Sequence, residues 1–242
     1  MKERPIKTPM RRTSFWLVLL ILLAVPLPIH PLSEETIPVV RYRAPLLVNG
    51  VPEGWRLISH AGTPRLTLVP SGGAYYIMMA SDARSGFGIE KPIRVDLKEY
   101  PYLNWTWRVT KLPQGGDIRR FDRDDQALQI YVVLPPTGRP HSLNTPILTY
   151  IWDTEAPKGL AVRSPKPLLK KIRYIVLRNK TDGIGRWYRE KRNVYEDYRR
   201  VFGDLDGGEP RGAVHGLRIY INSQNTKSQA EGYIGEIYFS KS

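Results

Sequence analysis

From Val39 onward, short apolar runs alternate with turn residues along the chain. The runs are rich in Val, Ile, Tyr and Trp and are separated by Gly, Pro, Asn and Asp, which is the pattern of β-strands joined by turns. The pattern predicts strands at residues 55–59, 65–69, 74–80, 86–89, 102–109, 126–134, 147–152, 173–178, 185–190, 216–222 and 233–239. This spacing of turns is typical of two antiparallel sheets packed face to face, so we predict an all-β, jelly-roll-like sandwich.

One segment departs from the strand pattern and has the spacing of a helix. Its apolar residues, which fall on one helical face, are Val194, Tyr195, Tyr198, Val201 and Phe202. Asn193 is a favourable N-cap for this segment. We predict one short helix over residues 193–202 that packs its apolar face against the sandwich.

Residues 15–25 form an uninterrupted apolar run. The basic residues before it are Lys2, Arg4, Lys7, Arg11 and Arg12, and the prolines after it are Pro26, Pro28 and Pro31. A basic segment, a short apolar helix and a helix-breaking stretch are the layout of a secretory signal, and the run is shorter than the roughly 20 residues that span a bilayer. We therefore expect the protein to be exported to the periplasm.

Two fates of this segment stay open. No small-x-small cleavage site follows the run, and extending it to Ile29 gives a proline-bent anchor in the inner membrane, with its basic end in the cytoplasm. The predicted division of the chain is residues 1–32 as signal peptide or N-terminal membrane anchor, residues 33–54 as connector and first strand, and residues 55–242 as β-sandwich domain. The 15–29 segment is the predicted membrane contact.

Composition narrows the chemistry and the partners. The chain has no Cys, which excludes thiol catalysis and thiolate metal sites. Its formal net charge is +14, of which the leader contributes four, leaving about +10 on the rest. An exported basic protein meets anionic lipid headgroups, lipopolysaccharide or acidic glycans, although surface Lys and Arg also serve solubility alone.

Carboxylates gather just before the strongest predicted strand, at Asp122, Asp124 and Asp125. A hard cation takes such ligands, but the loop lacks the Asp-x-Asp-x-Asp-Gly pattern, and arginines lie among the acids. Glycoside hydrolysis needs two carboxylates flanking one bond, and neighbours on a strand point to opposite faces. We expect a buried salt bridge or turn cap here, with Arg108 as a candidate partner, and we predict no metal and no cofactor.

Aromatic residues alternate along two predicted strands. Trp105 and Trp107 share one face, as do Tyr150 and Trp152, and large aromatics of this kind either fill a core or form a platform for a sugar ring. We expect three of these four side chains in the core and one in a cleft. The candidates for a concave polar and aromatic surface are Arg108, on the strand face opposite the tryptophans, and Gln129 and Tyr131, which share a face.

Familiar catalytic and nucleotide motifs are missing from the sequence. The four His residues are scattered, no G-x-S-x-G element is present, and the Gly-rich stretches lack phosphate-loop and dinucleotide spacing. The short basic run at residues 166–173 is explained by an anionic membrane or envelope polymer, so we expect no nucleic-acid partner.

Five collinear blocks resemble a family of exported bacterial proteins known as domain of unknown function 3047. They are L-N-W-T-W-R-V (103–109), D-D-Q-A-L-Q-I-Y-V-V (124–133), L-T-Y-I-W (148–152), R-N-V-Y-E-D-Y-R-R-V-F-G (192–203) and the closing N-S-Q-N-T…A-E-G-Y-I-G-E-I-Y-F. The resemblance implies a β-sandwich similar to galactose-binding-like and other carbohydrate-binding modules, with no established activity. Relatives carry a pattern like D-T-D-N-T where this chain has residues 222–226, so a metal role there is not implied.

Three functional hypotheses follow. The first is non-catalytic binding of a saccharide or a similar polar, anionic envelope polymer. The residues predicted to contact the ligand are Arg108, Asp125, Gln129, Tyr131, Trp152 and Asn225. The second is a carbohydrate-active hydrolase or lyase that uses Asp125 with Arg108, and the third is a membrane-anchored structural or assembly partner. The absence of a recognisable catalytic constellation favours the first, and no catalytic residue is predicted.

Overall fold

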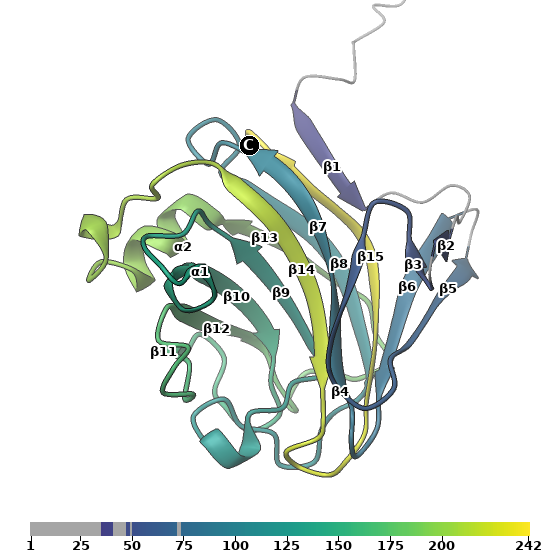
Figure 1. The fold of residues 1–242 in the computed structure, drawn as a ribbon. Helices are drawn as coiled ribbons and strands as arrows, with labels where there is room; N and C mark the ends of the chain where they lie inside the picture. The colour runs from purple at the N-terminus through teal and green to yellow at the C-terminus, as the bar shows by residue number, and fades with distance from the viewer. Residues whose placement is uncertain (1–34, 41–46, 49, 72–73) are drawn as a thin grey trace, which may run out of the picture. The chain divides into compact units, whose positions relative to one another are not determined.

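Two β-sheets face each other in the computed structural model, which describes residues 35–40, 47–48, 50–71 and 74–242 (Figure 1). The first sheet has the order β13 (Tyr188–Asn193), β8 (Tyr102–Lys111), β15 (Ala230–Ser240), β6 (Ala74–Ser81) and β5 (Arg65–Ser71), and β1 (Thr36–Val40) pairs with β15. We call it the six-stranded sheet. The predicted leader, including its apolar helix, lies outside the described residues.

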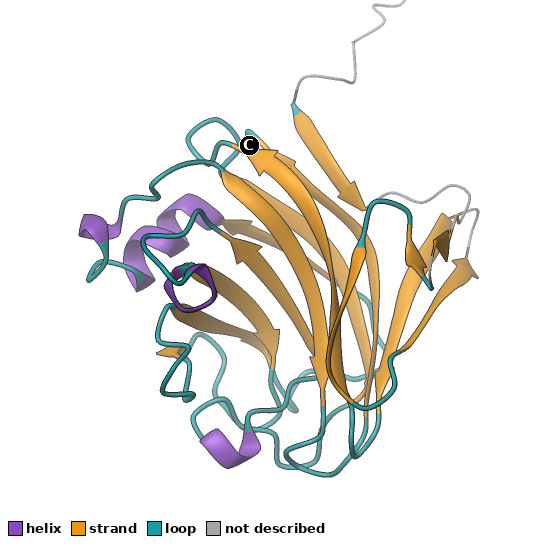
Figure 2. Ribbon diagram, in the orientation of Figure 1, coloured by secondary structure: helices purple, strands orange, loops and turns teal. Residues whose placement is uncertain are grey.

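The opposing sheet has seven strands. Their order is β11 (Ala161–Arg163), β12 (Ile172–Arg178), β10 (Ile147–Trp152), β9 (Leu128–Val133), β14 (Val214–Asn222), β7 (Gly86–Val95) and β4 (Arg56–Ala61). A small separate hairpin joins β2 (Leu47–Val48) to β3 (Val51–Pro52). Helices are few and short (Figure 2): α1 (His141–Asn144), α2 (Val194–Val201), η1 (Phe121–Arg123) and η2 (Asp206–Gly208).

The prediction of an all-β, two-sheet sandwich is confirmed, with one departure in strand direction. β10 and β12 form a parallel pair with Ile147 opposite Ile172, whereas the other described pairs are antiparallel. The residues of a strand such as 147–152 do not show whether it pairs parallel or antiparallel with its neighbour, which explains the error. Residues 33–54, where a connector and one first strand were predicted, contain the three short strands β1, β2 and β3, and the short strand β11 was not predicted.

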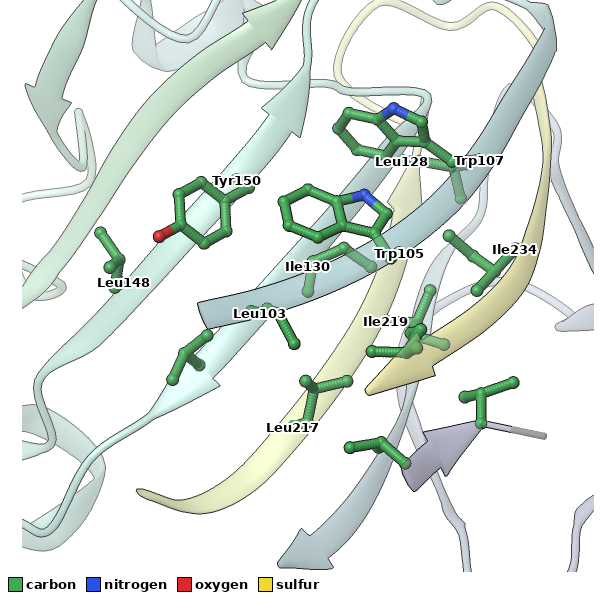
Figure 3. Packing of buried hydrophobic residues seen from close by; sticks show 14 of the residues in the cluster. Leu103, Trp105, Trp107, Leu128, Ile130, Leu148, Tyr150, Leu217, Ile219 and Ile234 are labelled. Atoms are coloured by element: carbon green, nitrogen blue, oxygen red, sulfur yellow. The ribbon is translucent and has the colours of Figure 1, made fainter. Parts of the chain in front are cut away.

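The core between the sheets is dominated by aromatic rings. Trp105 and Trp107 project from β8 toward Tyr150 on β10 (Figure 3). The ring centroids of Trp105 and Tyr150 are 5.3 Å apart, and those of Trp107 and Trp152 are 5.6 Å apart. All four side chains are at most 1% exposed, so the expectation that one of them lines a cleft is wrong.

Trp152 is therefore a core residue and not a ligand contact. Along β10 the residues Leu148, Tyr150 and Trp152 belong to the core between the sheets, while Ile147 and Ile151 belong to a second apolar cluster. Because successive side chains on a strand point to opposite faces, this second cluster lies on the outer face of the seven-stranded sheet.

Loops cover part of that outer face. The second cluster is completed by residues of three connections: Ile118 between β8 and β9, Ala156 and Leu160 between β10 and β11, and Leu169 between β11 and β12. This cover explains why β9, β10 and most of β12 are buried on both faces and have mainly apolar sequences. The outer face over β14, β7 and β4 is left more open.

The predicted helix is present as α2, and its cap is the predicted one. The Asn193 side chain accepts a hydrogen bond from the Glu196 backbone N–H at 3.1 Å. Val194 and Tyr198 are buried, whereas Tyr195 is only partly so. The helix is also joined to the core by a polar contact, because the Tyr150 hydroxyl donates to buried Asp197 Oδ2 at 2.9 Å.

No helix within the described ranges has the length and apolar character needed to cross a bilayer. The predicted membrane contact through residues 15–29 lies outside those ranges and stays a prediction.

Replacing Tyr150 by Phe tests the attachment of α2. The change removes a buried donor to the Asp197 carboxylate, so we expect the free energy of unfolding to fall by about 1.5–3 kcal/mol. Guanidinium denaturation measures the loss. Tyr238→Phe, on the outer face of the six-stranded sheet, is the control, with a change of about 0.5 kcal/mol or less. Equal stability of the two variants would contradict the assignment.

Candidate functional site

Strand register places one row of polar and aromatic residues across the outer face of the seven-stranded sheet. Each residue stands opposite the next on the neighbouring strand, and the row reads Arg56, Glu90, Arg218, Tyr131, Thr149 and Tyr174. Its charged end, made by Arg56, Glu90 and Arg218, lies on the edge strand β4 and on β7 and β14, and its aromatic end lies under the covering loops. The row therefore runs from the open part of the face to the closed part.

A second row runs beside it and contains a glycine. It reads Ile58, Gly88, Tyr220, Gln129 and Ile151. A Cβ atom at Gly88 would lie 2.6 Å from the Tyr220 ring and 2.6 Å from the Ile219 carbonyl oxygen. Because Gly88 has no side chain, the Tyr220 ring can pack directly against the backbone of β7.

A groove of about 190 Å³ opens between these rows and the loop that precedes β12. The lining residues are Ile58, Ser59, His60, Asp124, Gln129, Tyr131, Lys166, Leu169, Ile172, Tyr174, Arg218, Tyr220 and Asn222. The rings of Tyr131 and Tyr220 are nearly parallel, with an interplanar angle of 13° and centroids 5.9 Å apart. Tyr131 is only 7% exposed, so Tyr220 offers more of its ring to a ligand.

A chain of hydrogen bonds fixes the groove floor. The Tyr131 hydroxyl donates to Gln129 Oε1 at 2.7 Å, and Gln129 Nε2 donates to Asn222 Oδ1 at 2.7 Å. Asn222 Nδ2 then donates to the Asp124 carbonyl oxygen at 2.7 Å and to Asp125 Oδ1 at 2.8 Å. The predicted residues Gln129 and Tyr131 are thus brought together in one network.

Two predicted residues hold the network in place without lining the groove. Asp125 is fully buried, and its carboxylate accepts from Asn222 and from the Thr226 backbone N–H. Asn225 Nδ2 donates to the Asp124 carbonyl oxygen at 2.8 Å. Both side chains attach the loop after β14 to the turn before β9, so their role is to position Asn222.

Asp124 and Lys166 form the ion pair of the groove. Lys166 Nζ lies 3.3 Å from Asp124 Oδ2, and the Asp124 carboxylate is 4% exposed. Burial raises the pKa of the Asp124 carboxyl above its ordinary value, and the Lys166 ammonium opposes that shift. The pair offers both a donor and an acceptor to a ligand.

Arg108 is on the other sheet. It projects from the outer face of β8, where its guanidinium carbon lies 4.1 Å from the centre of the Tyr233 ring and 5.2 Å from that of Trp187. Arg108 and Asp125 therefore do not meet, since Arg108 lies against the rings of Tyr233 and Trp187, whereas Asp125 is bonded to Asn222 and Thr226. The hypotheses that pair them, as a salt bridge or as a catalytic couple, are wrong.

The described residues contain no group of three or more His, Asp or Glu side chains arranged to hold a metal ion. The Asp122 carboxylate accepts hydrogen bonds from the Arg120 guanidinium and so forms an ion pair on the surface. The three acids before β9 thus separate into a surface pair, a groove ion pair with Lys166 and a buried loop anchor.

Arg218 and Tyr220, which line the groove, were not among the predicted ligand contacts, and Asn222 was considered only as a possible hydrogen-bond donor to a sugar hydroxyl or as a turn residue. A signal for them was present, because they alternate along β14 with the core residues Leu217, Ile219 and Ile221. The alternation shows that they share a face, but not which strands lie beside them. Lys166 was noted only as part of the basic run at residues 166–173, and Glu90 was not singled out.

The family can now be stated from the match of its model to residues 53–238. The chain belongs to the DUF3047 family, a family of proteins of unknown function. The match runs from the turn before β4 to within β15, so this DUF3047 protein has its groove entirely inside the matched region. The chain has no match among curated proteins.

Solved structures with a similar course of chain include carbohydrate-binding modules. The family 11 module from Clostridium thermocellum, in complex with a β-1,3-1,4-mixed-linked tetrasaccharide, is 7% identical with a TM-score of 0.45, covering 85% of this chain and 95% of that one. The mannan-recognising module TmCBM27 is 10% identical with a TM-score of 0.38, covering 86% and 99%.

A third similar structure is an enzyme domain. The xyloglucanase domain of NopAA, a type three effector from Sinorhizobium fredii, is 11% identical with a TM-score of 0.44, covering 79% of the DUF3047 chain and 96% of its own. At these identities and scores the likeness concerns general architecture, and the ligands named belong to those proteins.

Replacing Asn222 by Asp tests the network. The carboxylate cannot donate to Asp125 and adds a second buried negative charge beside it, so we expect a loss of about 2–4 kcal/mol in the free energy of unfolding. Asn225→Asp is the matched control, because Asn225 is half-buried and makes one hydrogen bond to this turn; we expect about 1 kcal/mol. Urea denaturation measures both, and a smaller loss at position 222 would refute the network.

Asp153 predicts a pH dependence of stability. Its buried carboxylate accepts from the backbone N–H groups of Ile118, Glu155 and Ala156, joining two covering loops. Burial raises the pKa of Asp153 to about 6 from an ordinary 3.8, against the opposing hydrogen bonds. The folded state therefore binds this proton more tightly than the unfolded chain does, and the resulting stabilisation is lost as the pH rises from about 4 to about 6.

We expect the stability of the wild type relative to Asp153→Asn to fall across that window by at most about 3 kcal/mol and to be level above it. Denaturant midpoints from pH 4 to pH 8 measure the difference. A difference that stays constant over this range would rule out the shifted carboxyl.

Proposed function

We propose that the groove on the outer face of the seven-stranded sheet binds a saccharide and does not catalyse its conversion. The observation that carries the proposal is the pair of nearly parallel rings, Tyr131 and Tyr220, in an open groove. The Tyr131 hydroxyl is fixed by Gln129, which is bonded in turn to Asn222. The apolar face of a pyranose packs on such a ring. The two buried amides are bonded within the protein, so they hold the floor in place and leave the sugar hydroxyls to the other polar groups of the groove.

The other lining groups suit hydroxyl groups, which both donate and accept. Asp124 accepts, while Lys166 and Arg218 donate, and His60 lies at the rim of the groove. The volume of about 190 Å³ is smaller than the roughly 300–1,000 Å³ of drug-sized ligand sites, so the groove suits part of a saccharide, with the remainder outside.

The number of carboxylates in the groove favours binding over hydrolysis as its function. Hydrolysis needs two of them, about 5–9.5 Å apart across the scissile bond. Among the lining residues of this groove, Asp124 is the single carboxylate, and it is paired with Lys166. We also propose that the protein works in the cell envelope, which rests on its sequence leader, and the mass of the mature protein tests whether that leader is retained.

Tyr220 provides the direct test. Tyr220→Ala removes the ring that a sugar would stack on, and we expect binding to weaken about tenfold, whereas Tyr220→Phe keeps the ring and stays within about threefold of the wild type. Affinity electrophoresis against a panel of neutral and acidic polysaccharides gives the comparison.

Trp187→Ala is the control, since Trp187 is an exposed aromatic residue in the loop before β13 of the opposite sheet. It leaves binding unchanged under the proposal. Absence of retardation by every polysaccharide, or loss of binding in Trp187→Ala but not in Tyr220→Ala, would overturn the function.

A further inference from the structure

We infer that the groove selects acidic saccharides, with the carboxylate of a uronate ring held by Arg218 and Arg56 at the charged end of the first row. The inference rests on the proposed function and names the ligand class of that same groove. It depends on an excess of fixed positive charge at this end, on its distance from the stacking ring, and on the hydrogen-bonding capacity that the two arginines retain.

One carboxylate is shared by two guanidinium groups. Glu90 is 7% exposed; its Oε1 accepts from Arg56, and its Oε2 accepts from Arg218 Nε at 2.9 Å and Nη2 at 2.6 Å. Burial alone would raise the pKa of Glu90, but the two arginines outweigh it and lower the pKa, so the carboxylate is charged. A single negative charge thus faces two positive ones.

Both arginines retain capacity for another anion. Arg218 uses Nε and Nη2 on Glu90, which leaves its Nη1 without a hydrogen-bond partner in the described part of the chain. The Arg56 side chain is 70% exposed and bonds to Glu90 through Nη2 alone. Planar guanidinium groups match the geometry of a carboxylate, so a second carboxylate has donors from two sides.

The charged end lies next to the stacking surface. Arg218 and Tyr220 are two residues apart on β14 and share its outer face, and the Arg218 guanidinium carbon is 5.5 Å from the centre of the Tyr131 ring. Side chains two apart on a strand are roughly 6.5–7 Å apart. A pyranose stacked on Tyr220 would therefore bring a ring substituent to the guanidinium groups.

The remaining charges of the groove do not cancel this excess. Lys166 is paired with Asp124, and the residues of β4 that line the groove, Ile58, Ser59 and His60, include no carboxylate. Over the groove and its charged end, three permanently basic side chains face two carboxylates, one of which has a raised pKa. The excess has the same sign as the net charge of the whole chain, +14, which favours the approach of a polyanion.

The experiment compares one saccharide with and without its charge. Isothermal titration calorimetry is run with tri-galacturonate and with its fully methyl-esterified, neutral form, each at about 20 mM and 300 mM salt. We expect the acid to bind at least about tenfold more tightly at low salt, and the ratio to shrink at high salt. Polyglutamate serves as a polyanion that is not a saccharide and is expected not to compete.

Arg218→Gln is expected to reduce the ratio to about threefold or less, and Arg56→Gln to reduce it in the same direction. The second variant keeps the test decisive if the first fails to fold, because the Arg56 side chain is largely exposed. Arg189→Gln, an exposed residue of β13 on the opposite sheet, is the matched control and should leave the ratio unchanged.

The outcomes separate this inference from the proposed function. Equal binding of the acid and its ester, or binding only of a neutral polysaccharide through Tyr220, overturns the inference and leaves saccharide binding standing. An equal fall of the ratio in Arg189→Gln, or full competition by polyglutamate, also overturns it, because the selection would then be unspecific charge attraction. Failure to bind any saccharide overturns both.

Discussion

The four hydrogen bonds of the buried Asn222 side chain are the constraint on which the groove depends. Its oxygen accepts from the Gln126 backbone N–H and from Gln129, and its nitrogen donates to the two aspartates before β9. An asparagine amide can donate two hydrogen bonds and accept two, so all of its capacity is used here. Any shift in register between β14 and β9 would leave a buried polar group without a partner. The register that sets Tyr220 beside Gln129 is fixed by that cost.

The groove exists because the seven-stranded sheet is covered unevenly. Over β10 and β12 the connecting loops contribute Ile118, Ala156 and Leu169, and the outer face becomes a second apolar core. On the outer face of β7, Gly86 and Gly88 have no side chains to cover the sheet, and the Tyr220 ring occupies the space beside Gly88. A hollow with an aromatic floor is left where the cover ends.

The local pattern of the sequence was enough for the longer strands, for the helix at 194–201 and for placing Gln129 and Tyr131 on one face. It failed where the answer lay in pairing between distant strands. Trp152 was misplaced because β10 is buried on both faces, so alternation gives no direction there. Arg108 was misplaced because nothing local shows which sheet a strand joins, and Arg218 was missed because its neighbours are supplied by register.

The parallel pairing of β10 with β12 has an evolutionary consequence. A parallel neighbour obliges the chain to travel back along the sheet before β12 can start, and this return path carries Lys166 and Leu169 into the wall of the groove. Insertions or exchanges in the return path alter the wall while the register beneath it is preserved. Ligand preference can thus diverge among relatives that keep one and the same scaffold.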